Sequence, residues 1–195
     1  MKKIILLISL FVGLFAIDIN KIYYKSYNYE KMGDYKDAIK VLIPLYNKYP
    51  NAYTVNLRLG WLFYLNKNYK NSIFHYQKAS MSIPSSLEVK LGMMRVYYVM
   101  GDYSNALKIG NVILKSDYYN YYGNYYEVLS LVALKNYKVA EILVNKMLSI
   151  YPTSVSFLVE LGKIYKLTKR DASEIFKNVL ILDPNNVVAK EYFNK

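Results

Sequence analysis

The chain has 195 residues, an apolar fraction of 54% and a net charge of +12, which argues against intrinsic disorder. It contains no cysteine, so disulfides, thiolate metal sites, cysteine nucleophiles and lipid attachment at a bacterial export site are excluded. The lysines are spread along the chain without long runs of like charge, and no nucleic-acid-binding motif occurs, so we expect no nucleic-acid partner.

The first element in chain order is an export signal. Two lysines follow the initiator methionine, and residues 4–17 form an uncharged apolar run, shorter than the roughly 20 residues that a membrane span needs. Ala16 is the small residue expected before a cleavage site, although Leu14 is larger than such sites prefer. We predict a signal peptide at 1–16 that is either cleaved or kept as a membrane anchor, and a location in the periplasm or cell envelope.

A period of 34 residues organises the rest of the chain. Prolines, tyrosines and small residues recur in three separate series that share one register. The series are Pro50, Pro84 and Pro152, with Tyr118 at the vacant position; Tyr35, Tyr69, Tyr103 and Tyr137; and Ala38, Ser72, Ala106 and Ala140.

These series resemble the tetratricopeptide repeat family, whose unit is a 34-residue helix–turn–helix. The last unit matches the family pattern closely, at Leu161, Gly162, Tyr165, Ala172, Phe176 and Pro184. The resemblance, to an exported bacterial type, covers residues 19–195. It implies an all-α fold: a right-handed α-solenoid of about five helix–turn–helix repeats with a short C-terminal capping helix. The repeats are predicted near 19–50, 53–84, 87–118, 121–152 and 155–184, and the cap near 186–194.

Two departures from the repeat pattern predict local changes. Pro44 falls inside a predicted second helix, which it should kink or shorten because proline lacks the backbone donor. The last unit is two residues shorter between Tyr165 and Ala172, which predicts a tighter turn there.

The sequence offers no constellation for catalysis. His75 is the single histidine, so a zinc site has no second imidazole and no thiolate. No nucleophile elbow, phosphate loop or dinucleotide fingerprint occurs, and the carboxylates are scattered. We therefore expect a protein that is not an enzyme and that holds no cofactor and no metal.

Repeat arrays of this kind offer a concave surface lined by the first helix of each pair. Projecting the family pattern onto this chain predicts a binding stripe of aromatic and arginine side chains, the types that dominate interface energies. The stripe comprises Tyr23, Tyr27, Arg58, Trp61, Tyr64, Arg95, Tyr98, Tyr122 and Tyr125.

Two kinds of partner fit this stripe. The first is a protein or an extended peptide, bound by a non-enzymatic scaffold. The alternative is a glycan, such as peptidoglycan or an anionic polysaccharide, stacked on the aromatic rings. A third interpretation of the stripe involves no partner. An AT-rich genome would raise the tyrosine content without any function, and 24 tyrosines are present.

Overall fold

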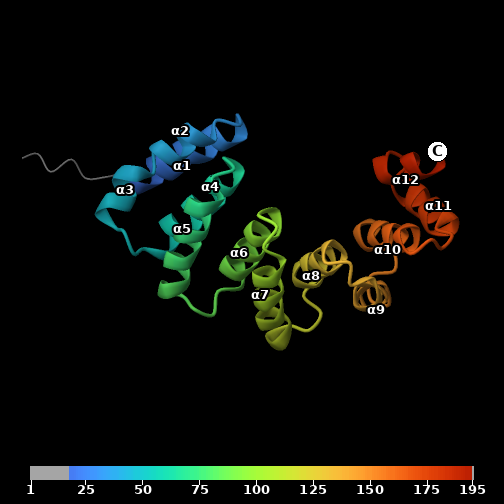
Figure 1. The fold of residues 1–195 in the computed structure, drawn as a ribbon. Coiled ribbons are helices and arrows are strands. Elements are labelled where there is room, and N and C mark those ends of the chain that lie inside the picture. Colours follow the sequence, from blue (N-terminus) through green and yellow to red (C-terminus); the bar gives the residue numbers. More distant parts are fainter. Residues whose placement is uncertain (1–17, 195) are drawn as a thin grey trace, which may run out of the picture.

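The computed structural model describes residues 18–194, in which all regular structure is helical. The helices form pairs that follow one another along an open arc, with α1 and α12 at its opposite ends (Figure 1). The first helices of the pairs are α1 (Ile19–Lys31), α4 (Tyr53–Leu65), α6 (Leu87–Val99), α8 (Tyr121–Ala133) and α10 (Val155–Leu167). The second helices are α2 (Tyr35–Lys40) with α3 (Ile43–Lys48), α5 (Tyr69–Ser82), α7 (Tyr103–Ser116), α9 (Tyr137–Leu148) and α11 (Ser173–Leu182), and α12 (Val187–Phe193) ends the array. The prediction of five helix–turn–helix repeats and a capping helix is confirmed.

The signal peptide predicted at 1–16 lies outside the described residues. Between residues 18 and 194, none of the helices combines the length and the apolar character that a membrane crossing requires.

The turn inside every pair contains one residue in the left-handed backbone conformation. In the second repeat this residue is Lys67, with φ of 58°. Its amide donates to the carbonyl of Tyr64, and the amide of Asn68 donates to that of Phe63, both at 2.9 Å, so the turn satisfies the last carbonyls of α4. The left-handed residues of the five repeats are Gly33, Lys67, Gly101, Lys135 and Lys169, each 34 residues from the next.

Close approach of helices from successive repeats depends on glycine. The ring of Tyr76 in α5 lies between Gly60 of α4 and Gly92 of α6. A Cβ atom on Gly92 would lie 2.5 Å from Cζ of Tyr76, and one on Gly60 would lie 2.8 Å from Cδ1 of the same ring. Because neither glycine has a side chain, one buried aromatic ring joins three helices of two repeats.

Pro44 divides the second helix of the first repeat. Helix α2 ends at Lys40, four residues before the proline, and α3 begins at Ile43. The proline ring would clash with the carbonyl of Lys40 in a continuous helix, and it has no N–H to donate. Pro44 instead lies in the first turn of α3, where a missing donor is tolerated.

The prediction of a tighter turn in the last repeat was wrong. The residues between α10 and α11 are 168–172, whereas the second repeat uses only 66–68. Helix α11 is four residues shorter than α5, with 10 residues against 14, and the turn before it is two residues longer, so the net loss is two residues. The left-handed position at Lys169 holds the turn in register, so the deletion shortens the helix that follows.

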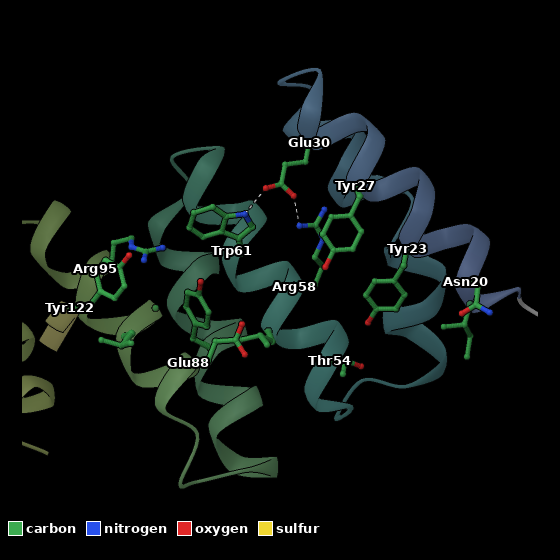
Figure 2. A pocket seen from close by; sticks show the side chains of 15 residues that line it. Asn20, Tyr23, Tyr27, Glu30, Thr54, Arg58, Trp61, Glu88, Arg95 and Tyr122 are labelled. Carbon is green, nitrogen blue, oxygen red and sulfur yellow. Dashed lines mark hydrogen bonds and ion pairs between the residues drawn. The ribbon is translucent and has the colours of Figure 1, made fainter. Parts of the chain in front are cut away.

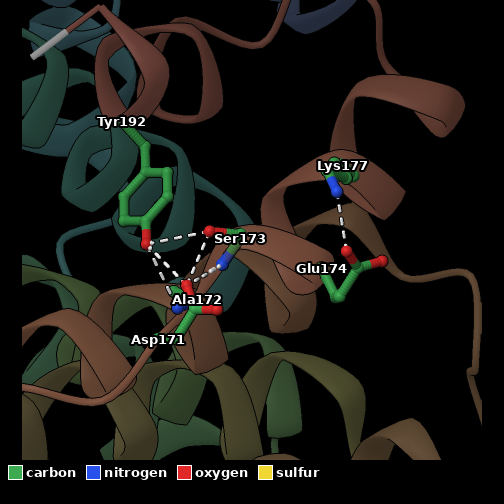
Figure 3. Close-up of polar contacts among 6 residues, drawn as sticks. All are labelled: Asp171, Ala172, Ser173, Glu174, Lys177 and Tyr192. Carbon is green, nitrogen blue, oxygen red and sulfur yellow. Dashed lines mark hydrogen bonds and ion pairs between the residues drawn. The ribbon is translucent and has the colours of Figure 1, made fainter.

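The capping helix is attached through Tyr192 (Figure 3). Its ring packs against Phe176 with centroids 4.7 Å apart. Its hydroxyl accepts a hydrogen bond from the amide of Ala172 at 3.2 Å and donates to Oδ1 of Asp171 at 3.1 Å. These contacts cover the exposed end of the last pair with a short amphipathic helix.

Two buried polar side chains of the second pair, Asn56 and His75, are hydrogen-bonded to each other. Asn56 is fully buried, and its amide donates to the carbonyls of Pro50 and Ala52 at 2.9 and 2.8 Å. Its Oδ1 must then accept, so the Nδ1–H of His75 donates to it at 2.9 Å. Burial lowers the pKa of His75 to about 4, with a further contribution from Lys78, and the imidazole is neutral at pH 7. His75 is therefore a structural residue.

Candidate functional site

A hollow of about 740 Å³ lies on the surface formed by the first helices of the first three repeats (Figure 2). We call it the groove. Its walls come mainly from α1, α4 and α6, and Tyr76 and Tyr122 reach it from α5 and α8. The residues that line it are Ile19, Asn20, Tyr23, Tyr27, Glu30, Thr54, Leu57, Arg58, Trp61, Tyr76, Glu88, Leu91, Gly92, Arg95 and Tyr122.

Arg58 is anchored at one wall of the groove and is only 6% exposed. It forms an ion pair with Glu30 of α1, and its Nη2 donates to Oγ of Ser26 at 3.2 Å. The guanidinium also lies 3.7 Å from the centroid of the Tyr27 ring. The charge of Arg58 is thus paired within the protein, and the ion pair joins the first repeat to the second.

Glu30 also holds Trp61. The indole Nε1 donates to Oε1 of Glu30 at 2.7 Å, and the indole ring stacks on Tyr64 with centroids 5.5 Å apart. A second, smaller hollow of about 370 Å³ shares Tyr27, Glu30 and Trp61 with the groove. Glu30 and Trp61 therefore line both hollows, and their hydrogen bond holds the indole in place (Figure 2).

Arg95 lies across the groove from the Arg58 ion pair and is held by aromatic rings. Its guanidinium carbon is 5.1 Å from the centroid of Trp61 and 5.8 Å from those of Tyr64 and Tyr126. Its Nε donates to the hydroxyl of Tyr126 at 3.0 Å. Within residues 18–194 its two terminal nitrogens donate no hydrogen bond and it forms no ion pair. Arg95 therefore presents an uncompensated charge in a fixed position.

Tyr27 and Tyr122 supply exposed aromatic surface at the groove, with exposed fractions of 50% and 57%. The hydroxyl of Tyr23 and Nε of Arg58, both on groove-lining side chains, are buried without a partner among the described residues. An unsatisfied buried polar atom costs about 1–3 kcal/mol.

Six of the nine residues predicted for the binding stripe line the groove: Tyr23, Tyr27, Arg58, Trp61, Arg95 and Tyr122. The other three, Tyr64, Tyr98 and Tyr125, do not line it and pack against core clusters between repeats. Burial, together with the nearby Glu160, raises the pKa of Tyr125 to about 12. The first helices place these three rings deeper between repeats than the family projection indicates.

Sequence reasoning missed two acidic residues of the groove, Glu30 and Glu88. A signal for Glu30 was present, because Tyr23, Tyr27 and Glu30 are spaced i, i+4 and i+7 and so share one helical face. On α6, Glu88 lies seven residues before Arg95, the same spacing as between Tyr23 and Glu30 on α1. Neither carboxylate belongs to the aromatic and arginine types on which the predicted stripe is based.

The groove is lined mainly by charged, aromatic and aliphatic side chains. Among residues 18–194, no cluster of three His, Asp or Glu side chains could hold a metal ion. The single imidazole is packed against Phe63, with ring centroids 5.2 Å apart, and does not line the groove. What this arrangement can do is hold a ligand through ring contacts and charge.

Comparison with known proteins supports the fold. A family model described as tetratricopeptide repeat matches residues 22–52, which include most of α1 and all of α2 and α3. No curated protein matches the chain. A solved tetratricopeptide repeat protein from Parabacteroides merdae ATCC 43184 superposes with a TM-score of 0.77 at 20% identity, covering 88% of this chain and 69% of that one.

Two further solved structures have the same fold. MamA from Desulfovibrio magneticus RS-1 gives a TM-score of 0.75 at 14% identity, covering 86% of this chain and 96% of that one. A thermophilic tetratricopeptide repeat protein from Thermus thermophilus gives 0.64 at 19% identity, covering 73% of this chain and 82% of that one. At these identities the likeness concerns the fold alone.

Proposed function

We propose that the chain, which has the tetratricopeptide repeat fold, is a non-catalytic scaffold that holds an extended segment of a partner protein in the groove. The observation that carries this proposal is the groove itself. It combines a hollow of about 740 Å³ with exposed aromatic rings and an arginine whose charge the described chain does not compensate. Aromatic and arginine side chains are the types that contribute most to binding at interfaces.

Tyr122 offers a direct test, with Tyr24 as the matched control. Both side chains are exposed, at 57% and 69%, but only Tyr122 lines the groove. Either alanine variant should change the free energy of unfolding by about 0.5 kcal/mol or less, as for other surface substitutions. In crosslinked pull-downs from intact cells, Tyr122→Ala should weaken partner capture and Tyr24→Ala should not. If both variants capture the partner equally well, the groove is not the binding site. If the protein binds purified cell wall and no protein partner, the ligand is a glycan.

We also propose that the scaffold acts outside the cytoplasm, in the periplasm or cell envelope. The support is the lysine doublet and apolar run at 1–17. A C-terminal reporter that is active only after export should give signal, and intact-mass analysis should find a chain that begins near Ile17. A full-length cytoplasmic product would contradict this location.

A further inference from the structure

The two arginines at the groove differ in how their charge is balanced. Arg58 is paired with Glu30 and is 6% exposed, so it has little capacity left for a ligand. Arg95 is partly exposed and has no carboxylate partner within the described residues. Both side chains line the same hollow. The groove therefore contains one internal ion pair, Arg58–Glu30, and two charged side chains that form no ion pair within the described residues, Arg95 and Glu88.

The position of Arg95 is determined before any ligand arrives. Tyr126 accepts the hydrogen bond from Nε, while Trp61 and Tyr64 on α4 flank the guanidinium. Only the terminal nitrogens remain for a ligand, and a guanidinium with free terminal nitrogens matches the two oxygens of a carboxylate. Because less side-chain freedom is lost on binding, such a preorganised cation binds an anion more tightly than a mobile surface lysine does.

The surface beside Arg95 is apolar. Leu57 and Leu91 line the same hollow as Arg95, together with Gly92 and an edge of the mostly buried Tyr76 ring. This apolar lining suits an apolar side chain of a ligand adjacent to the anionic group.

Glu88 limits where the negative charge of a ligand can sit. It is exposed, lines the groove, and lies seven residues before Arg95 on α6, about 10 Å along the helix axis. A second carboxylate of the ligand near Glu88 would be repelled. An extended peptide advances about 3.3 Å per residue, so this distance corresponds to about three ligand residues.

We infer that the groove binds an extended peptide through a carboxylate on Arg95, with an apolar side chain next to it over Leu57 and Leu91. The inference rests on the proposed function and specifies the partner: an acidic–apolar segment of a protein. The net charge of +12 favours the approach of such a segment.

Trp61 is the only tryptophan of the chain, and its ring lies 5.1 Å from Arg95, so its fluorescence reports on this position directly. The probes are synthetic nine-residue peptides with blocked ends that carry one Asp or Glu beside Leu or Phe. A matched set replaces the acid by Asn or Gln. A third set is neutral but has a free C-terminus, which distinguishes a terminal carboxylate from a side-chain one.

The full chain should bind acidic peptides at least about tenfold more tightly than amide-matched ones, with the preference weakening as salt rises. Arg95→Gln should abolish the preference, Arg95→Lys should keep part of it, and Glu88→Gln, at an exposed position, should strengthen it. Thermal melts of each variant verify folding. Preference by the free-terminus set over the amide-matched set would assign the carboxylate to a C-terminus.

Three results would overturn the inference. If amide-matched peptides bind as well as acidic ones, the carboxylate assignment is wrong and the proposed function stands. If Arg95→Gln melts normally and keeps the preference for acidic peptides, another residue binds the carboxylate. If no peptide in any set perturbs Trp61 or binds by anisotropy, both the inference and the peptide-binding function are wrong.

Discussion

Arg58 of α4 and Glu30 of α1 form an ion pair that joins the first two repeats, with side-chain exposures of 6% and 22%. The pair lies between elements that the chain separates by 28 residues. Trp61 donates to the same carboxylate, so two side chains of the second repeat are held by Glu30. Glu30 therefore adds a polar link to the hydrophobic core that joins the first two repeats.

Glu30→Gln should destabilise the protein strongly, because it leaves the guanidinium of Arg58 buried without a counter-charge. Removing one partner of a buried pair costs about 3–5 kcal/mol, and the partial exposure of Glu30 places the expected loss near the lower limit, at about 3 kcal/mol. Urea unfolding followed by circular dichroism measures it. The control is Glu174→Gln, which breaks the exposed Glu174–Lys177 pair (Figure 3) and should change stability by less than about 1 kcal/mol. Equal effects of the two changes would contradict the role assigned to Glu30.

Replacing the left-handed lysines by glycine should stabilise the array. Lys67 and Lys135 have φ of 58° and 60°, a conformation that costs an L-residue about 1 kcal/mol relative to glycine. Each Lys→Gly change should therefore raise the free energy of unfolding by up to about 1 kcal/mol, measured by urea unfolding.

The reverse change serves as the control. Gly33→Ala introduces a Cβ that meets no atom within 4 Å, so its expected loss of about 1 kcal/mol would arise from the backbone conformation alone. A destabilised Lys67→Gly variant together with an unaffected Gly33→Ala variant would disprove this account of the turns.

Gly92→Ala should destabilise for a steric reason. The new Cβ would lie 2.5 Å from Cζ of Tyr76, which is buried between Gly60 and Gly92 and cannot move aside. Overpacking of this kind costs about 1–3 kcal/mol, even though alanine favours helix more than glycine does. Combining it with Tyr76→Leu, which shortens the side chain, should recover part of the loss in thermal melts. If the double variant loses as much stability as the two single variants together, the clash with Tyr76 is not the cause of the Gly92→Ala effect.

Acid should weaken the protein through His75. Its pKa is lowered to about 4 in the folded state against 6.5 unfolded, so the unfolded chain binds the proton first. The stabilisation from the neutral imidazole is complete above pH 6.5 and is lost as the pH falls toward 4, by about 3 kcal/mol. His75→Gln keeps an amide donor for Asn56 and cannot titrate. Urea unfolding at pH 7.5 and 4.0 should show a smaller drop in the free energy of unfolding for His75→Gln than for the unchanged protein. Equal drops for the two proteins would contradict the prediction.

Much of the architecture was predictable because repeat structure is encoded locally. The spacing of Tyr35, Tyr69 and Tyr103 reflects the start of each second helix, and Pro44 indicated where one helix must break. These features depend on backbone donors, helix starts and turns, which are decided within a few residues of chain.

The site was only partly predictable, because it depends on how successive repeats stack. Helical spacing places Tyr64 and Trp61 on one face, yet Tyr64 packs into the core cluster between repeats while Trp61 lines the groove. Neither the pairing of Arg58 with Glu30 nor the framing of Arg95 by Tyr126 follows from spacing, since the partners are 28 and 31 residues apart. The sequence by itself determined the helices and their order along the chain. Only the tertiary structure decided which arginine is neutralised and which is available, because the packing angle between pairs brings distant side chains together, and no local interaction sets that angle.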